Sequence, residues 1–469
     1  MKLYSNNNDY KLYQGSMLNM LEVIEPNSID SIVTDPPYEL NFMGKGWDNS
    51  GIAFQPDTWR KCYAVLKPGG YLLAFGGSRT FHRIACAIED AGFEIRDTIM
   101  WLYGSGFPKS MALDKSLEAK LTTGSGNKKD FYKCNGTLEE SKGKGYTSMK
   151  QTNVEQEFRD KNYKSKGQLQ LDATTELAQK YKGYGTALKP SFEPIIVARK
   201  PFKGSLVDNV IEYGVGGINI DECRVGNEHF EIKNGDYDNN ENQSCFGNIK
   251  RTPKEYNGRF PANTILTYDD SDFDEVCGGF PNTKGGNRHN TAIRQSDKNS
   301  GYGFDTNTRN EFNDSGSASR YFYCAKASKK DRDEGCIELE DGLLRRMRPD
   351  KDDNNPTGLN KEGRFAPVVR KNTHPTVKPT ELMQYLVRLV SPNGATILDP
   401  FNGSGSTGKA VMYENKEKNK NYKYIGIELT EEYLPIAKAR IEYVCKDNNS
   451  TESLKENIIE GQKNIFDYL

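Results

Sequence analysis

The stretch ATILDPFNGSGSTGKAV, residues 395–411, joins an apolar run to a glycine-rich turn and a mixed segment. The apolar run predicts a buried β-strand, the glycines predict a tight turn, and STGKAVMYENK at 406–416 predicts an α-helix. A glycine turn between a strand and a helix lets the backbone approach a nucleotide-like ligand closely. The stretch therefore indicates an α/β fold with a ligand site, and it leaves the ligand open.

The glycine turn matches three ligand-binding patterns at once. Gly403, Gly405 and Gly408 satisfy the G-x-G-x-x-G pattern of dinucleotide sites, and with Lys409 they nearly complete a phosphate-binding P-loop. A P-loop needs a hydroxyl for magnesium directly after its lysine, and Ala410 supplies none. The turn could equally hold the adenosine of a methyl donor, or it could be a glycine-rich turn without a ligand.

Acidic residues on both sides of the turn help to choose the ligand. Asp399 precedes it and would repel a pyrophosphate, whereas S-adenosylmethionine carries an ammonium and a sulfonium that a carboxylate attracts. Glu428 ends a later apolar run, where it can accept both hydroxyls of a ribose. Asp399 therefore favours S-adenosylmethionine over NAD or a nucleoside triphosphate, whereas Glu428 suits any adenosine-type ribose and does not discriminate. Lys409 is then expected to be a surface side chain on the first turn of a helix, and its substitution to matter much less than that of Asp399.

Length and composition bound the class of protein. The chain has 469 residues, so we expect one large core with a substantial insertion or a second domain. The net charge of -1 gives no global attraction to nucleic acid, although a locally basic surface is compatible with it. Because no run of about 18 apolar residues and no charged-then-apolar leader are found, we expect a soluble, cytoplasmic protein without a membrane partner.

The nine cysteines predict neither disulfides nor a metal site. They include no C-x-x-C pair, which argues against a disulfide framework and for reduced thiols. Cys324, Cys336 and His374 could be imagined as zinc ligands, but their spacing matches no common zinc pattern. We therefore expect no bound metal.

Both ends of the chain alternate between strand and helix patterns. The first part predicts strands at 29–33, 71–77 and 95–103, with helices at 58–70 and 81–93. After residue 375 the pattern predicts helices at 379–390, 406–416 and 430–444, and strands at 395–401 and 422–429. Such alternation implies parallel strands with crossover helices, so the two ends are interpreted as parts of one α/β domain.

The middle of the chain has a different character. Residues 101–190 hold 16 Lys and Arg against 10 Asp and Glu, and Asn, Asp and Gly dominate residues 225–320. A solvated, loop-rich insertion is the simplest interpretation. Strand-like runs survive in PSFEPIIVARKPF (190–202), GRFPANTILTY (258–268) and SASRYFYCAKAS (317–328). We therefore divide the chain at 1–110, 111–370 and 371–469, with the outer parts forming one domain.

A second motif, TDPPY at 34–38, follows directly on the first predicted strand. Pro36 and Pro37 fix the backbone and restrict the residue before each of them, so the turn is stiff. It could be a rigid turn with an incidental aromatic residue. It could also bind an exocyclic amine such as N6 of adenine, with Asp35 and the Pro36 carbonyl accepting its hydrogens and the ring of Tyr38 stacking on the base. A base in a duplex reaches such a site only when it is flipped out of the helix.

Three ordered motifs identify a family. TDPPY, HPTVKP at 374–379 and LDPFNGSGSTG at 398–408 together resemble the amino-group DNA methyltransferases, which modify N6 of adenine or N4 of cytosine. Their order, with the catalytic motif first and the cofactor motifs last, is similar to the permuted beta class. Other phrases of the chain resemble a subset of these enzymes that is common in prokaryotes and their viruses. These phrases are FMGKGWD, WLYGSGFPKS, GTALKPSFEPI, GRFPAN and FYCAKASKKDR.

The resemblance implies a role for each matching residue. Asp35, Pro36, Pro37 and Tyr38 match the catalytic D-P-P-Y, which binds the amine and stacks on the base. The cofactor residues would be Asp399, Phe401, Gly403 and Gly405 of the loop, Glu428 as the ribose-binding acid, and Thr376 with Lys378 beside the methionine moiety. The middle of the chain corresponds to target recognition, and residues 115–175 and 225–315 hold no motif that can be assigned to a base.

The resemblance also implies a fold and a reaction. The fold is a seven-stranded, mostly parallel Rossmann-like sheet, circularly permuted, in which the loops after Val33 and Leu398 lie side by side. The cofactor would be S-adenosylmethionine and the partner double-stranded DNA, and a homodimer and a companion restriction endonuclease are compatible with it. Asp35 at the first catalytic position favours N6 of adenine over N4 of cytosine. Alternatives are an N4-cytosine enzyme, methylation of RNA or protein, or a non-catalytic module that binds DNA or nucleotide.

Overall fold

The computed structural model describes residues 1–40, 46–103, 110–124, 174–232, 254–268, 282–283, 316–317, 322–326, 329–340, 342–344 and 368–445. The chain divides into two compact units. The larger comprises 1–105, 191–339 and 374–469, and the smaller comprises 106–190 and 340–373. Segments from both ends of the chain therefore share one unit with part of the middle.

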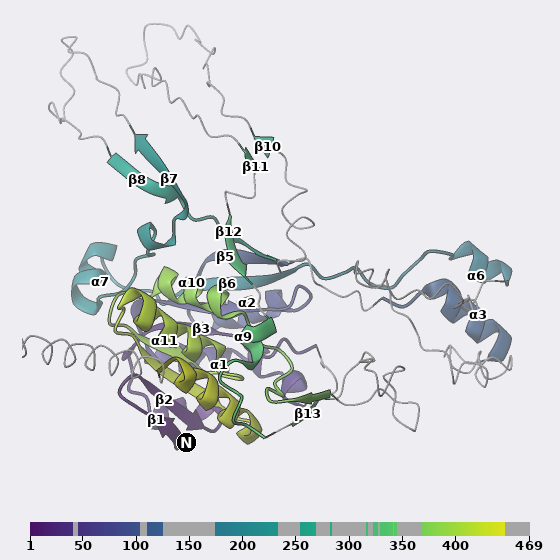
Figure 1. Ribbon diagram of the computed structural model, residues 1–469, viewed down its shortest axis with the longest axis horizontal. Coiled ribbons are helices and arrows are strands. Elements are labelled where there is room, and N and C mark those ends of the chain that lie inside the picture. Colours follow the sequence, from purple (N-terminus) through teal and green to yellow (C-terminus); the bar gives the residue numbers. More distant parts are fainter. Residues whose placement is uncertain are drawn as a thin grey trace, which may run out of the picture. The chain divides into compact units, whose positions relative to one another are not determined.

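The larger unit is built on a ten-stranded sheet in the order β1-β2-β16-β15-β3-β4-β6-β5-β9-β12 (Figure 1). In chain order its strands are β1 (Lys2–Asn6), β2 (Tyr10–Gln14), β3 (Ile29–Thr34), β4 (Leu66–Phe75), β5 (Glu94–Tyr103), β6 (Phe192–Arg199), β9 (Thr264–Tyr268), β12 (Tyr323–Lys326), β15 (Thr396–Asp399) and β16 (Lys423–Glu428). Most neighbours are parallel, and the antiparallel pairs are β1 with β2 and the two pairs that β6 makes. The predicted α/β fold with a mostly parallel sheet is confirmed, and the sheet is larger than the seven strands expected.

Helices and short strand pairs complete this unit. The helices are α1 (Pro56–Val65), α2 (Phe81–Asp90), α7 (Leu206–Tyr213), α9 (Lys329–Asp333), α10 (Thr380–Val390) and α11 (Ser406–Lys418). After the 3-10 turn η7 (Glu431–Tyr433), a further helix runs over residues 434–445. Two further antiparallel pairs are β7 (Val225–Ile232) with β8 (Lys254–Arg259), and β10 (Asn282–Thr283) with β11 (Gly316–Ser317).

Strands from the two ends of the chain are direct neighbours. β15 lies parallel to β3, with Leu398 opposite Ile32 and Ile397 opposite Ser31. Parallel strands end at the same edge of a sheet, so the segments that follow β3 and β15 leave the sheet side by side. This is the arrangement that the two predicted motif loops require.

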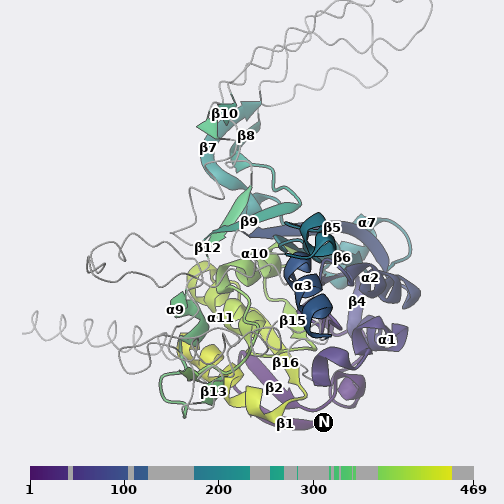
Figure 2. The same cartoon turned by 90° about the vertical axis from the view of Figure 1, so that its right-hand side faces the viewer.

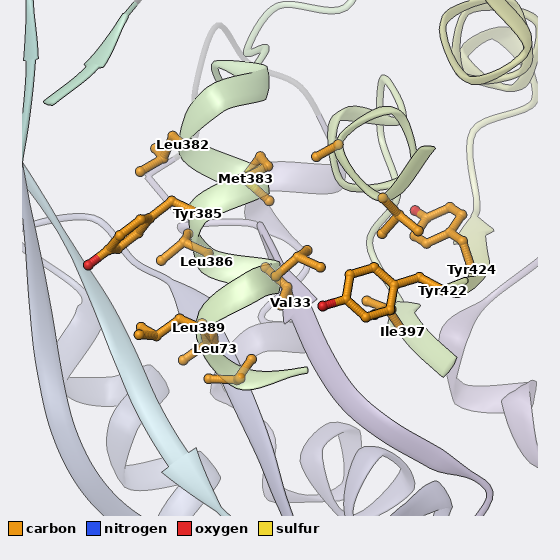
Figure 3. Close-up of a cluster of buried hydrophobic side chains, with 14 of the residues drawn as sticks. Val33, Leu73, Leu382, Met383, Tyr385, Leu386, Leu389, Ile397, Tyr422 and Tyr424 are labelled. Carbon is orange, nitrogen blue, oxygen red and sulfur yellow. The ribbon is translucent and has the colours of Figure 1, made fainter. Parts of the chain in front are cut away.

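Side chains of the central strands alternate between two cores, one on each face of the sheet. On one face Val33, Leu73 and Ile397 pack with residues of α10 and α11 (Figure 3). On the other face Ile32 and Leu72 pack with residues of α1 and α2. Figure 2 shows these two pairs of helices on opposite sides of the sheet. Because both faces are covered, the central strands are apolar on both sides, as their sequence predicts.

Three strands of the sheet come from the middle of the chain. β6, β9 and β12 correspond to the three strand-like runs at 190–202, 258–268 and 317–328. β6 lies between β4 and β5 and is antiparallel to both, so the predicted strand at 95–103 is not parallel to its inner neighbour. Periodicity predicts that a segment forms a strand, but it does not say which strand lies next to it.

One predicted helix is shorter than expected. The pattern at 58–70 predicts a helix that Pro68 and two glycines stop, whereas α1 ends at Val65 and Leu66 already begins β4. Leu66 has extended backbone angles of φ -74° and ψ 138°. The residue before a proline avoids the helical region, and this preference helps to keep the segment before Pro68 extended.

The described residues of the smaller unit form two helices and one strand pair: α3 (Leu113–Thr123), α6 (Glu176–Lys180), and β13 (Gly342–Leu344) with β14 (Val368–Arg370). Glu118 of α3 accepts hydrogen bonds from the backbone amides of Thr174 and Thr175 at 3.1 and 3.0 Å. These bonds satisfy amides at the start of α6 and join two helices that are distant in sequence. Within the described ranges of both units, no helix is long and apolar enough to cross a membrane.

Candidate active site

The candidate site lies at the ends of β3 and β15, where the TDPPY turn and the glycine turn leave the sheet. Asp35 directly follows β3, and Asp399 is the last residue of β15. The buried Thr34 hydroxyl donates a hydrogen bond of 2.6 Å to Asp399 Oδ1. The two motifs are therefore in direct contact, although they lie near opposite ends of the sequence.

Lys378, from the HPTVKP segment, is the centre of a cluster of charged and phenolic groups. Its Nζ lies 2.7 Å from Asp35 Oδ2 and 3.3 Å from Glu193 Oε2. Nζ also donates to the Tyr38 hydroxyl at 3.1 Å, and that hydroxyl donates to Glu193 Oε2 at 2.7 Å. We call Lys378, Asp35, Tyr38 and Glu193 the Lys378 cluster. It contains two carboxylates for one ammonium.

Burial and neighbouring charges set the protonation of this cluster. Burial raises the pKa of Asp35, and Lys378 offsets part of that rise. Burial alone would lower the pKa of Lys378, but Asp35 and Glu193 raise it above its usual value. Nζ also lies 4.9 Å from the ring centroid of Phe75 and 5.2 Å from that of Tyr38, and both ring faces attract a cation. Lys378 is therefore charged and holds a carboxylate with an increased proton affinity.

One oxygen of Asp35 is left for a ligand. Oδ2 is bound by Lys378, whereas Oδ1 is buried and accepts no hydrogen bond from any residue that the structure describes. Leaving a buried acceptor without a donor costs about 1–3 kcal/mol, so such atoms are uncommon and call for an explanation. The Asp35 side chain as a whole is 22% exposed, so the carboxylate lies close to the surface of the site although Oδ1 itself is buried. An exocyclic amine is a group from which Oδ1 can accept a hydrogen bond.

The glycine turn has backbone conformations that side chains rarely adopt. Gly403 has a φ of 51°, and a Cβ atom there would lie 2.9 Å from Nε2 of His374. Gly405 has a φ of 74°, and its Cβ would lie 2.9 Å from the Cα of Ala437. Glycine alone meets both the positive φ and the close approach without strain. Burial lowers the pKa of His374 to about 3, so the ring beside Gly403 is neutral.

Asp399 ties the start of the glycine turn to the sheet. Its Oδ1 accepts from the Phe401 amide at 3.1 Å, in addition to the Thr34 hydroxyl, and Oδ2 accepts from the Thr407 hydroxyl at 2.6 Å. Burial raises the pKa of Asp399 to about 6, although these hydrogen bonds act in the opposite direction. Asp399 thus fixes the turn and carries a negative charge at neutral pH.

Glu428 holds the turn from the next strand. Its Oε2 accepts from the amide of Gly403 at 2.7 Å, and its Oε1 accepts from the amide of Thr430 at 2.8 Å. Burial raises the pKa of Glu428 as well. Each carboxylate oxygen has a second lone pair, so Glu428 can still accept from the hydroxyls of a ribose.

Lys409 is not a surface residue, and that prediction is wrong. Its side chain is fully buried, and Nζ lies 2.6 Å from Asp331 Oδ1 and 2.8 Å from Glu334 Oε2. The reason is that α11 is buried around its first turns, where carboxylates from α9 and the residue after it reach the lysine. We call Lys409, Asp331 and Glu334 the Lys409 cluster. Because these carboxylates bind the ammonium, Lys409 is not available to a phosphate.

The remaining predicted residues differ in their surroundings. The Phe401 ring lies 6.4 Å from that of Trp59 and packs against the core of the α1 and α2 face. Pro36 is buried and Pro37 partly buried, as expected of a stiff turn below the site. Thr376 is exposed, in contrast to the buried Lys378 two residues later. The structure thus brings the TDPPY turn, Lys378 and the glycine turn to one edge of the sheet.

Glu193 and Asp331 are site residues that the sequence did not predict. Glu193 lies in the phrase GTALKPSFEPI and Asp331 in FYCAKASKKDR, both of which resemble the family but carry no assigned role. Each acid stands directly next to an apolar or basic run, which is an ordinary context for a charged residue. The two resemblance phrases were therefore the only available signal.

The residues at the glycine turn suit a cationic methyl donor better than a phosphate. The turn is flanked by the buried carboxylates of Asp399 and Glu428, and Lys409 is bound elsewhere. A carboxylate attracts the ammonium and sulfonium of S-adenosylmethionine and repels a phosphate. In the described parts of the chain, no three His, Cys, Asp or Glu side chains gather to hold a metal ion.

Curated relatives of the chain include type II methyltransferases of bacteria. The type II methyltransferase M.HpaI of Haemophilus parainfluenzae is 33% identical over 111 residues, which are 22% of this chain and 34% of that protein. M2.LlaDCHI of Lactococcus lactis subsp. cremoris is 24% identical over 241 residues, which are 46% of this chain and 82% of that protein. The match thus spans about a third of M.HpaI and most of M2.LlaDCHI.

Solved structures and a family model extend the comparison. The cytosine-N4-specific PvuII DNA methyltransferase is 12% identical, with a TM-score of 0.38 over 96% of this chain and 94% of that one. The crystal structure of M1.HpyAVI is 12% identical, with a TM-score of 0.33 over 92% and 98%. The family model of the N6 and N4 DNA methylases matches residues 29–439. Because this match covers most of the chain, the protein belongs to the N6/N4 DNA methylase family, and S-adenosylmethionine is its cofactor.

Proposed function

We propose that the protein transfers a methyl group from S-adenosylmethionine to the N6 amine of an adenine in double-stranded DNA. The observation that carries this proposal is Asp35 Oδ1, a buried acceptor beside Lys378 that receives no hydrogen bond from the described residues. An exocyclic amine supplies the donor that this atom needs. The proposal goes beyond family membership in naming the base, the atom and the residues.

Asp35 and Pro36 would prepare the amine for attack. The lone pair of an exocyclic amine is delocalised into the ring of the base, so the amine is a weak nucleophile. Hydrogen bonds to Asp35 Oδ1 and to the Pro36 carbonyl draw both hydrogens aside and let the nitrogen become tetrahedral. When the new N–C bond forms, the nitrogen becomes cationic and loses a proton. Asp35 is placed to take that proton, because burial has raised its pKa.

Lys378 and Glu193 would hold the reacting groups in place. Lys378 binds Oδ2 of Asp35, so Oδ1 keeps one orientation without a change of rotamer. Glu193 accepts from the Tyr38 hydroxyl, which anchors the far end of the tyrosine and leaves its ring for stacking. Stacking of a base on an aromatic ring is worth about 1–3 kcal/mol, which would offset much of the energy needed to flip the base out of a duplex.

The cofactor would be held by the glycine turn and its two acids. Gly403 and Gly405 let the backbone approach the ligand, Glu428 would accept the ribose hydroxyls, and Asp399 provides negative charge near the methionine end. Phe401, Thr376 and Lys378 are proposed to complete this part of the site. When bound, S-adenosylmethionine would supply a methyl group on a positively charged sulfur, and the sulfur would leave as a neutral thioether when the S–C bond breaks. The adjacency of β3 and β15 supports in-line placement of donor and acceptor.

The choice of adenine rests on the residue at the first catalytic position, since an aspartate there favours N6 over N4. It is tested with purified protein, tritiated S-adenosylmethionine and plasmid DNA, followed by digestion to nucleosides and chromatography. We expect the label in N6-methyladenine. Label in N4-methylcytosine alone would overturn the adenine assignment and leave the amine mechanism intact. Sequencing for modified positions in the same plasmid would give the recognition site and the strand.

The acceptor class and the partners need separate tests. Competition among double-stranded DNA, RNA and protein for the tritiated methyl group should favour DNA. Residues 111–370 are proposed to include the target-recognition region, which the local excess of positive charge at 101–190 supports. Analytical ultracentrifugation would test a homodimer, and cleavage of unmethylated DNA by the product of a neighbouring gene would test a companion restriction endonuclease.

A further inference from the structure

Asp331 of α9 connects the starts of two helices that follow the cofactor motifs. Its Oδ2 accepts from the backbone amide of Thr380 at 2.7 Å, and its Oδ1 accepts from the Thr380 hydroxyl at 2.5 Å. Thr380 is the first residue of α10 and directly follows the HPTVKP segment. Oδ1 also lies 2.6 Å from Nζ of Lys409, in the first turn of α11, which follows the glycine turn.

The bond to Thr380 supplies a cap that α10 lacks. The residue before the helix is Pro379, which offers no side-chain cap, so the first amides of α10 need an acceptor from elsewhere. A carboxylate at a helix N-terminus satisfies such an amide and interacts favourably with the helix dipole. Asp331 does both from a distant segment of the chain. The start of α10, and with it the end of the HPTVKP segment, is therefore fixed by α9.

A second link joins α9 to the glycine turn itself. Arg440 is fully buried, and its Nη1 donates to the Ser404 carbonyl at 2.9 Å and to the Ser406 hydroxyl at 3.0 Å. Its Nη2 donates to the Asp331 carbonyl at 3.4 Å and lies 3.7 Å from Asp331 Oδ1. The arginine that binds the turn is thus itself held by Asp331.

A third link reaches the other side of the turn. Arg332, the neighbour of Asp331, donates a hydrogen bond to the backbone carbonyl of His374. The His374 ring is the group that a Cβ on Gly403 would meet, so its position limits the space beside the turn. All three links start from residues 331 and 332 and end at the two segments predicted to bind the cofactor.

The charges around Asp331 make its carboxylate hard to replace. Lys409 and Arg440 are two fully buried cations, and Asp331 and Glu334 are the carboxylates nearest to them. Burial on its own would raise the pKa of Asp331, but Lys409 lowers it below its usual value. Removing one partner of a buried ion pair leaves an uncompensated charge, which destabilises its surroundings. Loss of the Asp331 charge would act first on its partners Thr380, Lys409 and Arg440, which join it to the cofactor motifs.

We propose that Asp331 is a positioning residue for the methyl donor: it holds the HPTVKP segment and the glycine turn in their binding geometry without touching the cofactor. The proposal rests on the assignment of S-adenosylmethionine to the glycine turn. It gives a function to FYCAKASKKDR (322–332), a phrase in the middle of the chain that includes β12 and most of α9 and precedes the HPTVKP segment.

The test compares Asp331→Asn with a matched control, Glu414→Gln. Glu414 is fully buried on α11 and accepts from Arg388 of α10 at 2.6 and 3.0 Å. It therefore also forms a buried ion pair, in this case between α10 and α11. That pair lies far along both helices from the cofactor motifs, which precede their first residues. Both substitutions remove one negative charge with little change in shape. A purely structural role for Asp331 predicts the same behaviour for both variants.

The affinity for S-adenosylmethionine is measured by isothermal titration calorimetry, with thermal unfolding and steady-state kinetics alongside. Both variants should unfold at a lower temperature than the wild type. Asp331→Asn should raise the Kd and the KM for S-adenosylmethionine about ten-fold, with kcat at saturating cofactor within about three-fold, whereas Glu414→Gln should leave the Kd within about two-fold. Should Asp331→Asn not fold, Thr380→Val, which removes a single hydrogen bond, should raise the Kd about three-fold.

An unchanged Kd in Asp331→Asn, or an equal rise in Glu414→Gln, would overturn the proposal. These results leave the proposed function untouched, because they concern only how the turn is held. A wild-type protein that does not bind S-adenosylmethionine would instead overturn the cofactor assignment, and the proposal with it. The two failures are therefore distinguishable in one set of titrations.

Discussion

The Lys378 cluster and the Lys409 cluster contain similar groups, but they differ in how many oxygens of their aspartate accept a hydrogen bond. In each, a buried lysine from a cofactor motif meets two carboxylates from distant segments: Asp35 and Glu193 for Lys378, and Asp331 and Glu334 for Lys409. In the Lys409 cluster the lysine is fully buried and Asp331 bonds through both oxygens. In the Lys378 cluster one oxygen of Asp35 is buried without a donor among the described residues.

This difference separates a group that reacts from a group that supports. A carboxylate whose two oxygens both accept hydrogen bonds from the protein holds its neighbours in place. A carboxylate with one oxygen fixed and one open has a defined direction in which to accept a hydrogen bond. Two buried lysine–carboxylate pairs should therefore respond to substitution in different ways, one in turnover and the other in cofactor affinity.

The largest effect is expected from Asp35→Asn, which replaces the acceptor Oδ1 or Oδ2 with an amide donor. We expect kcat for DNA methylation to fall by at least about 10³-fold, because the amine loses the group that aligns it and takes its proton. Binding of S-adenosylmethionine should stay within about two-fold of the wild type, since the glycine turn is unchanged. Tritium transfer and calorimetry measure the two quantities.

Asp30→Asn is the matched control for this substitution. Asp30 lies on β3, the strand that Asp35 follows, is 8% exposed and binds Nζ of Lys67 at 2.6 Å. It also accepts from the amide of Thr396, so it is as well connected as Asp35 but lies at the other end of β3. Its loss should lower the unfolding temperature and leave kcat within about two-fold. Equal losses of turnover in both variants would mean that Asp35 acts through folding alone.

Lys378→Met should reduce kcat by about 10²-fold and move the pH profile. Lys378 lowers the pKa of Asp35, so its removal lets burial raise that pKa further. The acid limb of the rate profile should then shift to higher pH, because Asp35 needs a higher pH to be ionised. Lys409→Met should show the reverse pattern, with weaker cofactor binding and an unmoved acid limb. An acid limb that stays in place in Lys378→Met would argue that Asp35 is not the titrating group.

The sequence predicted the parts of the site that lie on strand ends. Apolar periodicity located β3 and β15, and the resemblance to the methyltransferases implied that the loops after Val33 and Leu398 lie side by side, which the structure confirms. Parallel strands end at the same edge of a sheet, so two motifs that follow neighbouring parallel strands must lie close together. The resemblance supplied the strand order that periodicity alone does not give.

Residues whose partners depend on strand order or on irregular segments could not be predicted in this way. Glu193 reaches the cluster because β6 inserts between β4 and β5, and periodicity carries no information on that insertion. Lys409 was predicted to be exposed because the partner that buries it, Asp331, lies in a segment without regular apolar spacing. A lysine next to a glycine turn looks the same in sequence whether it binds solvent, phosphate or a buried carboxylate.

Asp399 should make cofactor affinity depend on pH near neutrality. Its pKa is about 6 against an ordinary 3.8, so the folded protein protonates it as the pH falls through about 6. A neutral carboxyl attracts a cation less, so the Kd for S-adenosylmethionine should rise by up to about five-fold between pH 6 and pH 5. Calorimetry over pH 5 to 8 measures this. Asp399→Asn should bind weakly with no dependence over that range, and a pH dependence that persists in this variant would exclude Asp399 as its source.

The same pKa gives a stability prediction of opposite sign. Because the folded-state pKa lies above the unfolded one, the stabilisation linked to this proton is complete below about pH 3.8 and is lost as the pH rises through about 6. Bound S-adenosylmethionine should remove part of that loss by lowering the pKa of Asp399. The rise in unfolding temperature on adding cofactor should therefore be larger at pH 7 than at pH 5. An equal rise at both values would show that Asp399 does not sense the cofactor.

The smallest effect on kcat is expected from Glu193→Gln, and the direction in which it shifts the pH profile is more informative than the size of the loss. Glutamine still accepts from the Tyr38 hydroxyl, so kcat should fall by only about three-fold. Glu193 raises the pKa of Asp35, so removing its charge should move the acid limb of the rate profile to lower pH, opposite to Lys378→Met. Glu334→Gln removes the corresponding carboxylate from the Lys409 cluster and should leave the acid limb in place. Opposite shifts of the acid limb in Glu193→Gln and Lys378→Met, with no shift in Glu334→Gln, would assign the titration to the Lys378 cluster. A general loss of stability could not move the acid limb in both directions.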